Sequence, residues 1–261
     1  MIPMQPTAQA LARTYSDRVY SDPWEKVLDY RRVLEYSAEH PNAGRVRVGN
    51  ALDLPNERVR GWLNDAIPDP VRGINTASEH GWLDPEPDGD TAAALVELLA
   101  HVLAGGSIGR KTFAVAVTPG RRVDIDEIHT AFERVGVETH VRHRKEDGRA
   151  TEVVPAADGS VLGRCLVAMG AVQGDKTTIE QLPSPVWEVP IDVRREFVRI
   201  YAGHRATTWE SKATLRIQEQ RPRSYLDDLT RLITDLTGES VTAGELAVTV
   251  SADAARELGL A

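Results

Sequence analysis

The feature of this sequence that most constrains its fold is an internal repeat. Residues 91–103 and residues 192–203 each place apolar side chains along one face of a helix and run into small residues. Behind each helix the pattern predicts a strand, a helix, a strand and a last helix. Two such copies about one hundred residues apart predict a pseudo-two-fold domain. Because the strands follow one another without long crossovers, we expect antiparallel sheets with helices on one face.

Two proline-rich segments divide the chain. Residues 83–90 (LDPEPDGD) combine proline, glycine and acids without periodicity. Residues 181–190 (QLPSPVWEVP) contain three prolines, which favour an extended strap over a helix. The predicted organisation is an N-terminal helical domain (1–83) and an α+β domain (90–261) made of repeat one (90–180), a linker (181–190) and repeat two (191–261).

Composition excludes several classes of protein. A hydrophobic fraction of 41% supports a folded core, and no apolar run approaches the ~18 residues that a membrane span needs. The sequence has one cysteine and no pattern of a secretory signal, which indicates a cytoplasmic protein. It has no phosphate-binding loop and no Cys/His cluster, so we expect no cofactor. The formal charge of −8 argues weakly against nucleic acid, although net charge says little about one face.

The N-terminal part carries a candidate DNA-reading helix. Residues 44–65 predict two short helices separated by a turn at Leu54–Pro55–Asn56, with Asn56 as the N-cap of the second helix. This arrangement resembles a helix-turn-helix, whose second helix reads bases in the major groove. The alternative is an ordinary helical hairpin with a solvated basic face. The candidate DNA-binding residues, with side chains suited to guanine and adenine, are Asn56, Arg58, Arg60 and Asn64.

The duplicated order, with each copy opened by a helix that ends in small residues, resembles the single-chain LAGLIDADG homing endonucleases. In that family the two opening helices pack together, and an acid at each helix end holds the divalent metal that cleaves DNA. The nine motif letters fall on residues 98–106 and 198–206, which puts the acid positions at Gly105 and Arg205. Neither side chain offers a carboxylate oxygen, so the resemblance implies no metal site and no cleavage. The alternative is an unrelated α+β domain.

The same resemblance implies that the two antiparallel sheets form a saddle over double-stranded DNA. Alternation in two predicted strands separates apolar from polar side chains, and the polar set should face outward. Each of these charged residues alone could equally be a solvated surface group. The candidate DNA-binding residues of the saddle are His140, Arg142, Arg144, Arg216, Gln218 and Gln220.

Three functions are consistent with these features. The first is a sequence-specific DNA-binding protein, a transcription regulator that is not an enzyme. Bacterial regulators of the WhiA type combine a helix-turn-helix with this fold, although here the helix-turn-helix comes first. The second is an active endonuclease with rearranged acids, for which Glu97 and Glu196 are the nearest carboxylates. The third is a ligand- or protein-binding module carried by a DNA-binding helix-turn-helix. The sequence identifies no protein partner.

Overall fold

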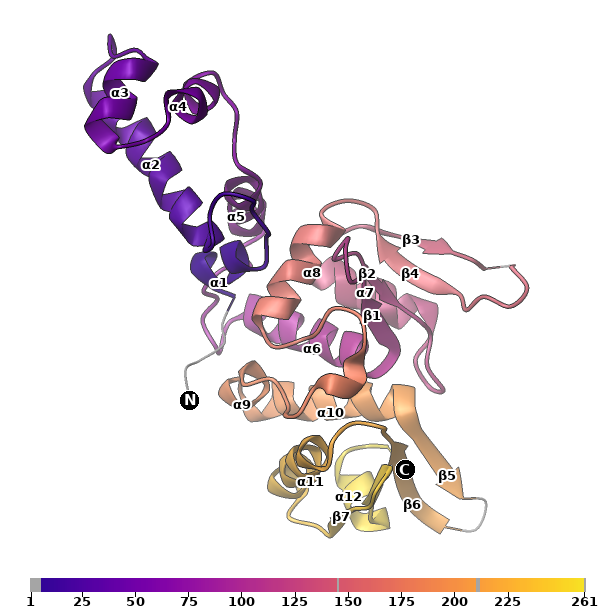
Figure 1. The fold of residues 1–261 in the computed structure, drawn as a ribbon. Helices are drawn as coiled ribbons and strands as arrows, with labels where there is room; N and C mark the ends of the chain where they lie inside the picture. Colours follow the sequence, from indigo (N-terminus) through magenta and orange to yellow (C-terminus); the bar gives the residue numbers. More distant parts are fainter. Residues whose placement is uncertain (1–5, 145, 210–211, 261) are drawn as a thin grey trace. The chain divides into compact units, whose positions relative to one another are not determined.

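The structure is a computed structural model that describes residues 6–144, 146–209 and 212–260. The described chain forms two compact units, one of residues 7–79 and one of residue 6 together with the residues from 80 onward (Figure 1). Trp82 belongs to the second unit, because its ring is buried and its Nε1 donates to the Val135 carbonyl at 2.9 Å. The first unit therefore ends at Glu79, slightly before the predicted boundary at residue 83.

The first unit is entirely helical in the residues that the structure describes. Asp22 caps α2 by accepting a hydrogen bond from the Trp24 amide, and Pro23 occupies the first helical position, where a missing N–H costs nothing. Val27, Val33 and Val59 are buried between the helices. The helices are α1 (Ala8–Arg13), α2 (Pro23–Glu39), α3 (Arg45–Leu52), α4 (Asn56–Leu63) and α5 (Asp69–Glu79).

The second unit contains the two repeats. Repeat one consists of α6 (Asp90–Gly105), β1 (Gly106–Ile108), β2 (Val115–Val117), α7 (Ile125–Arg134), β3 (Thr139–Arg142), β4 (Glu152–Pro155) and α8 (Gly159–Ala168). The connection holds a short 3₁₀ helix, η1 (Lys176–Thr178), and α9 (Pro185–Glu188). Repeat two consists of α10 (Ile191–Arg205), β5 (Ala206–Trp209), β6 (Lys212–Gln218), α11 (Arg223–Thr237), β7 (Val241–Ala243), β8 (Ala247–Val250) and α12 (Ala252–Glu257).

Each repeat folds into a four-stranded antiparallel sheet with the same connectivity. The strand orders are β1-β2-β4-β3 in the first sheet and β5-β6-β8-β7 in the second. The prediction of an α+β fold with duplicated antiparallel sheets is confirmed. The predicted order lacked β1, β5 and β7; β1 and β5 follow α6 and α10 without a break, so no turn residues mark where they begin.

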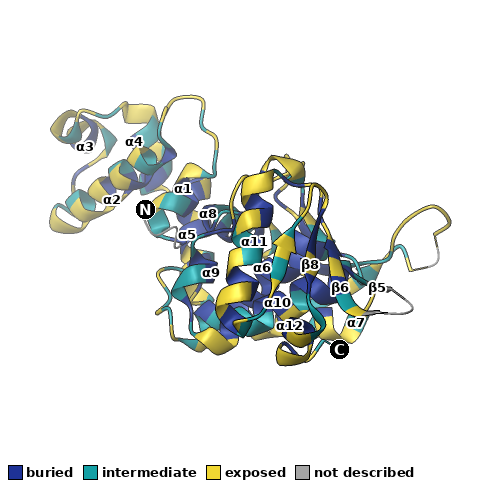
Figure 2. Ribbon diagram, turned by 90° about the horizontal axis from the view of Figure 1, so that it is seen from below, coloured by how far each residue is buried: buried dark blue, intermediate teal, exposed yellow. Residues whose placement is uncertain are grey.

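The core lies between the sheets and the paired helices α6 and α10, which run side by side (Figure 1). Almost every residue of α6 is buried, and Figure 2 shows this helix dark while α11 and α12 keep exposed outer faces. Val117 and Val153 of the first sheet and Ile217 and Val248 of the second point into this core. The start of α7 is fixed by its local sequence, because Asp124 and Glu127 form a reciprocal capping box there.

The connection between the repeats differs from its prediction. Residues 181–190 were expected to be extended, but α9 forms over Pro185–Glu188. Pro185 occupies the first position of this helix, where proline is well tolerated. Among the described helices, none is long and apolar enough to cross a membrane.

Candidate functional site

The C-terminal ends of α6 and α10 occupy equivalent places in the two repeats. α6 ends at Gly105 and passes directly into β1, and α10 ends at Arg205 and passes directly into β5. The strands then pair alike, with Gly106 opposite Val117 and Ala206 opposite Ile217. Gly105 and Arg205 are therefore equivalent positions, as the spacing of the two copies predicted.

A buried histidine pair joins the two helix ends. His101 Nδ1 lies 2.9 Å from His204 Nε2, and both rings are buried. The imidazole of His204 also fills the space beside Gly105, where even a methyl group would overlap it. Burial lowers the pKa of His101 to about 3, with a further contribution from His204. Burial, Lys176 and Arg205 lower the pKa of His204 to about 4, so both rings are neutral near pH 7.

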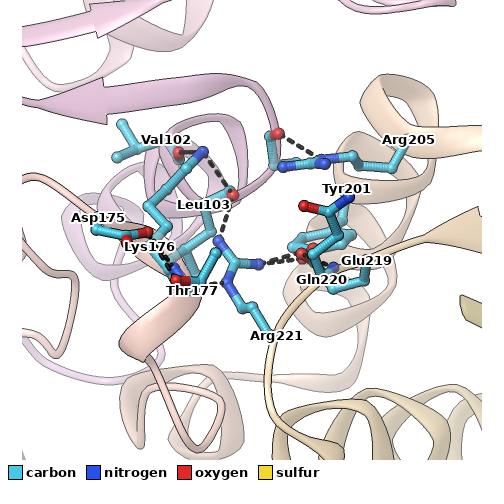
Figure 3. A network of polar contacts seen from close by, with 11 residues as sticks. Val102, Leu103, Asp175, Lys176, Thr177, Tyr201, Arg205, Glu219, Gln220 and Arg221 are labelled. Carbon is cyan, nitrogen blue, oxygen red and sulfur yellow. Dashed lines mark hydrogen bonds and ion pairs between the residues drawn. The ribbon is translucent and has the colours of Figure 1, made fainter. Parts of the chain in front are cut away.

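Three cationic side chains converge on the last carbonyls of α6 (Figure 3). Lys176 Nζ donates to the Val102 and Leu103 oxygens at 3.2 and 3.1 Å. Arg205 Nε donates to the Ala104 oxygen at 2.7 Å, and Arg221 Nη2 donates to the Leu103 oxygen at 2.7 Å. The Val102 carbonyl also accepts from the Gly106 amide, whereas no later helical N–H follows to bond the Leu103 and Ala104 carbonyls. All three lie at the negative end of the helix dipole, so cations are favoured there. We call Lys176, Arg205 and Arg221 the helix-end cluster.

A buried network fixes Arg221 within this cluster. Its guanidinium forms an ion pair with Glu219 at 2.8 Å, and both side chains are almost completely enclosed. The Tyr201 hydroxyl donates to Glu219 and accepts from Arg221, and the guanidinium also lies over the Tyr225 ring. Burial raises the pKa of Tyr201, which keeps its hydroxyl protonated. The network is a rigid support that leaves Arg221 no free face.

Lys176 has no acid of its own in this arrangement. Burial is the main cause that lowers its pKa to about 7, and the neighbouring Arg221 and Arg205 lower it further. Glu219 raises it only in part, because that carboxylate is bound to Arg221. Sequence reasoning did not single out Lys176. The one available signal was Arg205 at an expected acid position.

The helix ends do not fit a divalent metal. Mg²⁺ requires oxygen ligands, whereas residue 105 has no side chain and residue 205 is a cation that would repel it. Across the described residues, no group of three or more His, Cys, Asp or Glu side chains could hold a metal ion. Glu97 and Glu196 are held by arginines, Glu97 by Arg134 and Glu196 by Arg199 at 3.1 Å.

The outward face of the second sheet is polar. Strand pairing aligns Thr207, Arg216, Thr249 and Thr242 in one row across all four strands. Arg216 is exposed, and within the described part of the chain its guanidinium forms no ion pair or hydrogen bond. Gln218 and Gln220 are also exposed, while Leu215 and Ile217 are buried on the opposite face. The predicted alternation along β6 is therefore observed.

The first sheet has a different outward face. Its equivalent row is Ser107, Ala116, Val154 and His140, and the two central residues are apolar and only 4% and 6% exposed. His140, Arg142 and Arg144 are exposed, but β3 is an edge strand and Arg144 lies beyond its end. Arg142 Nε is bound to Glu152 at 2.6 Å. The position equivalent to Arg216 is thus Ala116, and the two predicted sets of DNA-binding residues lie on non-equivalent strands.

The helical unit places its four candidate residues on α4 or at its end. Asn56 is exposed but is the first residue of α4, so its predicted role as N-cap is wrong, and Pro55 holds that position. Arg58 is half-buried, with Nη1 donating to the Tyr20 hydroxyl at 2.8 Å and its guanidinium over the Tyr20 ring. Arg60 and Asn64 are exposed, and Asn64 donates to the Arg60 carbonyl. Glu57 lies 3.8 Å from Arg60, so the exposed face carries mixed charge.

No family model and no curated protein matches this sequence. Solved structures that resemble the fold include two from different proteins. One is full-length DUF199/WhiA from Thermatoga maritima, at 12% identity and a TM-score of 0.44, covering 67% of this chain and 56% of that one. The other is the homing endonuclease I-WcaI bound to its DNA recognition sequence, at 10% identity and a TM-score of 0.42, covering 64% of this chain and 78% of that one. No functional assignment rests on similarities of this size.

Proposed function

We propose that this chain binds double-stranded DNA without cleaving it and acts as a transcription regulator. The observation that carries the proposal is the outward row of the second sheet, where Arg216 lies exposed among three threonines. An arginine on a twisted antiparallel sheet can reach a base edge or a phosphate, and the threonine hydroxyls can bond to either. Gly105 and Arg205 at the helix ends support binding without metal-dependent cleavage.

The helical unit supports a regulatory role. α3 and α4 are joined by a three-residue turn in which Asp53 adopts a left-handed conformation. The exposed face of α4 presents Asn56, Arg60 and Asn64, which suit base-edge contacts in a major groove. Arg58 contributes less, because its guanidinium is engaged by Tyr20.

A second candidate function is the binding of a small polar ligand. A cleft of about 460 Å³ lies along α6, α7 and α10 and is lined by side chains of both charges. Glu97, Arg122, Glu127, Arg134, Glu196 and Arg199 are its charged residues. Most of these charged side chains already have partners within the protein; Arg122, for example, donates to the Leu260 carbonyl. Ligand binding in this cleft is therefore less well supported than DNA binding.

The test of DNA binding uses the full chain, labelled duplex fragments and supercoiled plasmid, with Mg²⁺ present, over a series of salt concentrations. We expect retarded, uncut DNA whose affinity falls steeply with salt. Arg216→Ala should weaken binding by about tenfold or more, as for loss of one well-placed arginine contact. Arg142→Ala is the matched control and should change affinity by less than about threefold, because its guanidinium is already bound to Glu152.

The other outcomes separate the competing functions. Nicked or linear plasmid that persists after further purification would show an active nuclease and overturn the proposal. A folded protein that binds no duplex at low salt would also overturn it and would favour the ligand-binding cleft.

A further inference from the structure

We propose that the helix-end cluster is a phosphate-binding site, in which Arg205 and Lys176 supply the positive charge and the free hydrogen-bond donors. If the bound phosphate belongs to the DNA backbone, the inference rests on the proposed function. The site itself rests on charge balance, free donors and position.

The charge balance within the cluster calls for an anion. Arg205 and Arg221 are permanent cations, Lys176 is a third cation whenever it is protonated, and Glu219 is the single acid bonded within the cluster. Asp175 is the other nearby acid, but it is exposed, accepts hydrogen bonds from Thr177 and faces Arg110. Positive charge withdrawn from water without a counter-ion is costly, so a bound anion would stabilise this arrangement.

Free donors are available on two of the three cations. Arg205 uses only Nε on the Ala104 carbonyl, and no described residue accepts from its terminal nitrogens. Lys176 uses two of its three N–H groups on Val102 and Leu103. Arg221 is fully engaged with protein groups and serves as support. A planar guanidinium beside an ammonium matches the oxygens of a phosphate group.

The position of the cluster favours a ligand shared by the two repeats. Arg205 immediately precedes β5, and its partner Ala104 lies two residues before β1. The cluster therefore lies where the first strands of both sheets begin. Arg205 and Lys176 are both half-buried, which leaves part of each side chain open to solvent. A phosphate bound here would contact the cluster at the junction of the two repeats.

The lowered pKa of Lys176 supports this assignment and supplies a direct signal. At about 7 it reflects burial beside two guanidinium groups. A bound phosphate would add the missing negative charge and raise this pKa. The change can be followed by NMR of the lysine side chains in the unaltered protein, so this signal does not depend on a variant that folds.

The experiment has two arms. In the first, inorganic phosphate and pyrophosphate are titrated into the full chain at pH 7, with calorimetry and the Lys176 NMR signal as readouts. In the second, the salt dependence of duplex binding is measured for the wild type, Arg205→Gln and Lys176→Gln. Glutamine can still donate to the α6 carbonyls without charge. Arg256→Gln is the matched control, an exposed arginine on α12 of repeat two that is paired with Asp253.

We expect the Lys176 pKa to rise on adding phosphate or duplex. We also expect each cluster variant to reduce the slope of log affinity against log salt by about 0.9, while Arg256→Gln leaves it unchanged. A slope change without binding of free phosphate would assign the site to the DNA backbone. If free phosphate instead binds to the wild type and not to Arg205→Gln, while the salt slopes of duplex binding stay unchanged, that result would assign the site to a free phosphate ligand.

The inference is overturned if neither ligand shifts the pKa of Lys176 and both cluster variants behave as Arg256→Gln does. This failure is distinct from failure of the proposed function. If the protein binds duplex through Arg216 while the cluster variants match the control, DNA binding stands and the phosphate site does not. If it binds no duplex at all, the first arm alone decides the site.

Discussion

The two repeats of the second unit share a topology but present different outward surfaces. Inward-facing positions are apolar in both, with Val117 in one sheet matching Ile217 in the other. Outward, Ala116 stands where the second repeat has Arg216, and at the helix ends Gly105 stands where it has Arg205. The core requirement keeps these inward positions apolar in both copies, whereas the outward row and the helix ends differ. The polar surface suited to a ligand is concentrated in repeat two.

The largest expected effect concerns the histidine pair, to which each repeat contributes one ring at a non-equivalent position. In the fold the pKa values are about 3 for His101 and about 4 for His204, whereas unfolded histidine titrates near 6.5. Below pH 6.5 the unfolded state therefore binds more protons, and stability is lost as pH falls towards the folded-state values. Each ring should lower the free energy of unfolding by up to about 1.4 kcal/mol for each pH unit of acidification below 6.5. At pH 5 the two rings together should have lowered it by about 3–4 kcal/mol.

Cys165 offers a probe for this loss of stability, because it is the single cysteine and is buried in α8. Urea unfolding at pH 7, 6 and 5, read by pulsed thiol labelling at one fixed pH, reports on the duplicated domain alone. His101→Gln removes one of the two rings and should make the pH slope shallower by up to about 1.4 kcal/mol per unit. A variant that keeps the wild-type slope would show that the acid sensitivity arises elsewhere.

The next effect compares the two equivalent helix ends. Gly105→Ala should destabilise the second unit by about 1–3 kcal/mol, because the added methyl group overlaps the buried ring of His204. The equivalent position holds an arginine without conflict, since α6 offers it the Ala104 carbonyl and no ring. The same urea titration tests this difference.

His204→Ala provides the control for this steric interpretation. In that background Gly105→Ala should cost less than about 1 kcal/mol, because the ring that it would meet is gone. If the cost is the same in both backgrounds, backbone freedom of glycine and not packing explains Gly105.

Sequence reasoning reached the repeat, the sheet type and the inward and outward faces of β6, because these follow from periodicity in segments long enough to show it. It placed Gly105 and Arg205 at equivalent ends from spacing alone. It missed β1, β5 and β7, of which β1 and β5 continue directly from α6 and α10 with no turn signal between helix and strand. It also missed Lys176 and Glu219, whose roles depend on a loop and a strand end that meet only after the repeats have packed. The contact of His101 with His204 is likewise a product of tertiary structure.

The smallest effect is expected for a variant that tests whether the outward row of the first sheet also approaches DNA. Ala116→Arg places in repeat one the side chain that repeat two already carries at position 216. We expect a gain in duplex affinity of less than about tenfold at low salt and a salt slope steeper by about 0.9, for one added phosphate contact. The gain is limited because Ala116 is only 4% exposed, so an arginine there must first extend past its neighbours to reach a ligand.

Ala116→Gln is the matched control for added bulk, and it should leave the salt slope unchanged because it adds no charge. Circular dichroism and urea unfolding should show both variants folded before binding is compared. A folded Ala116→Arg variant with the wild-type slope would mean that DNA contacts the second sheet alone. The two repeats would then differ in role as well as in surface, with repeat one serving as the support that positions α6, the cluster of cations at its end and the polar sheet beyond it.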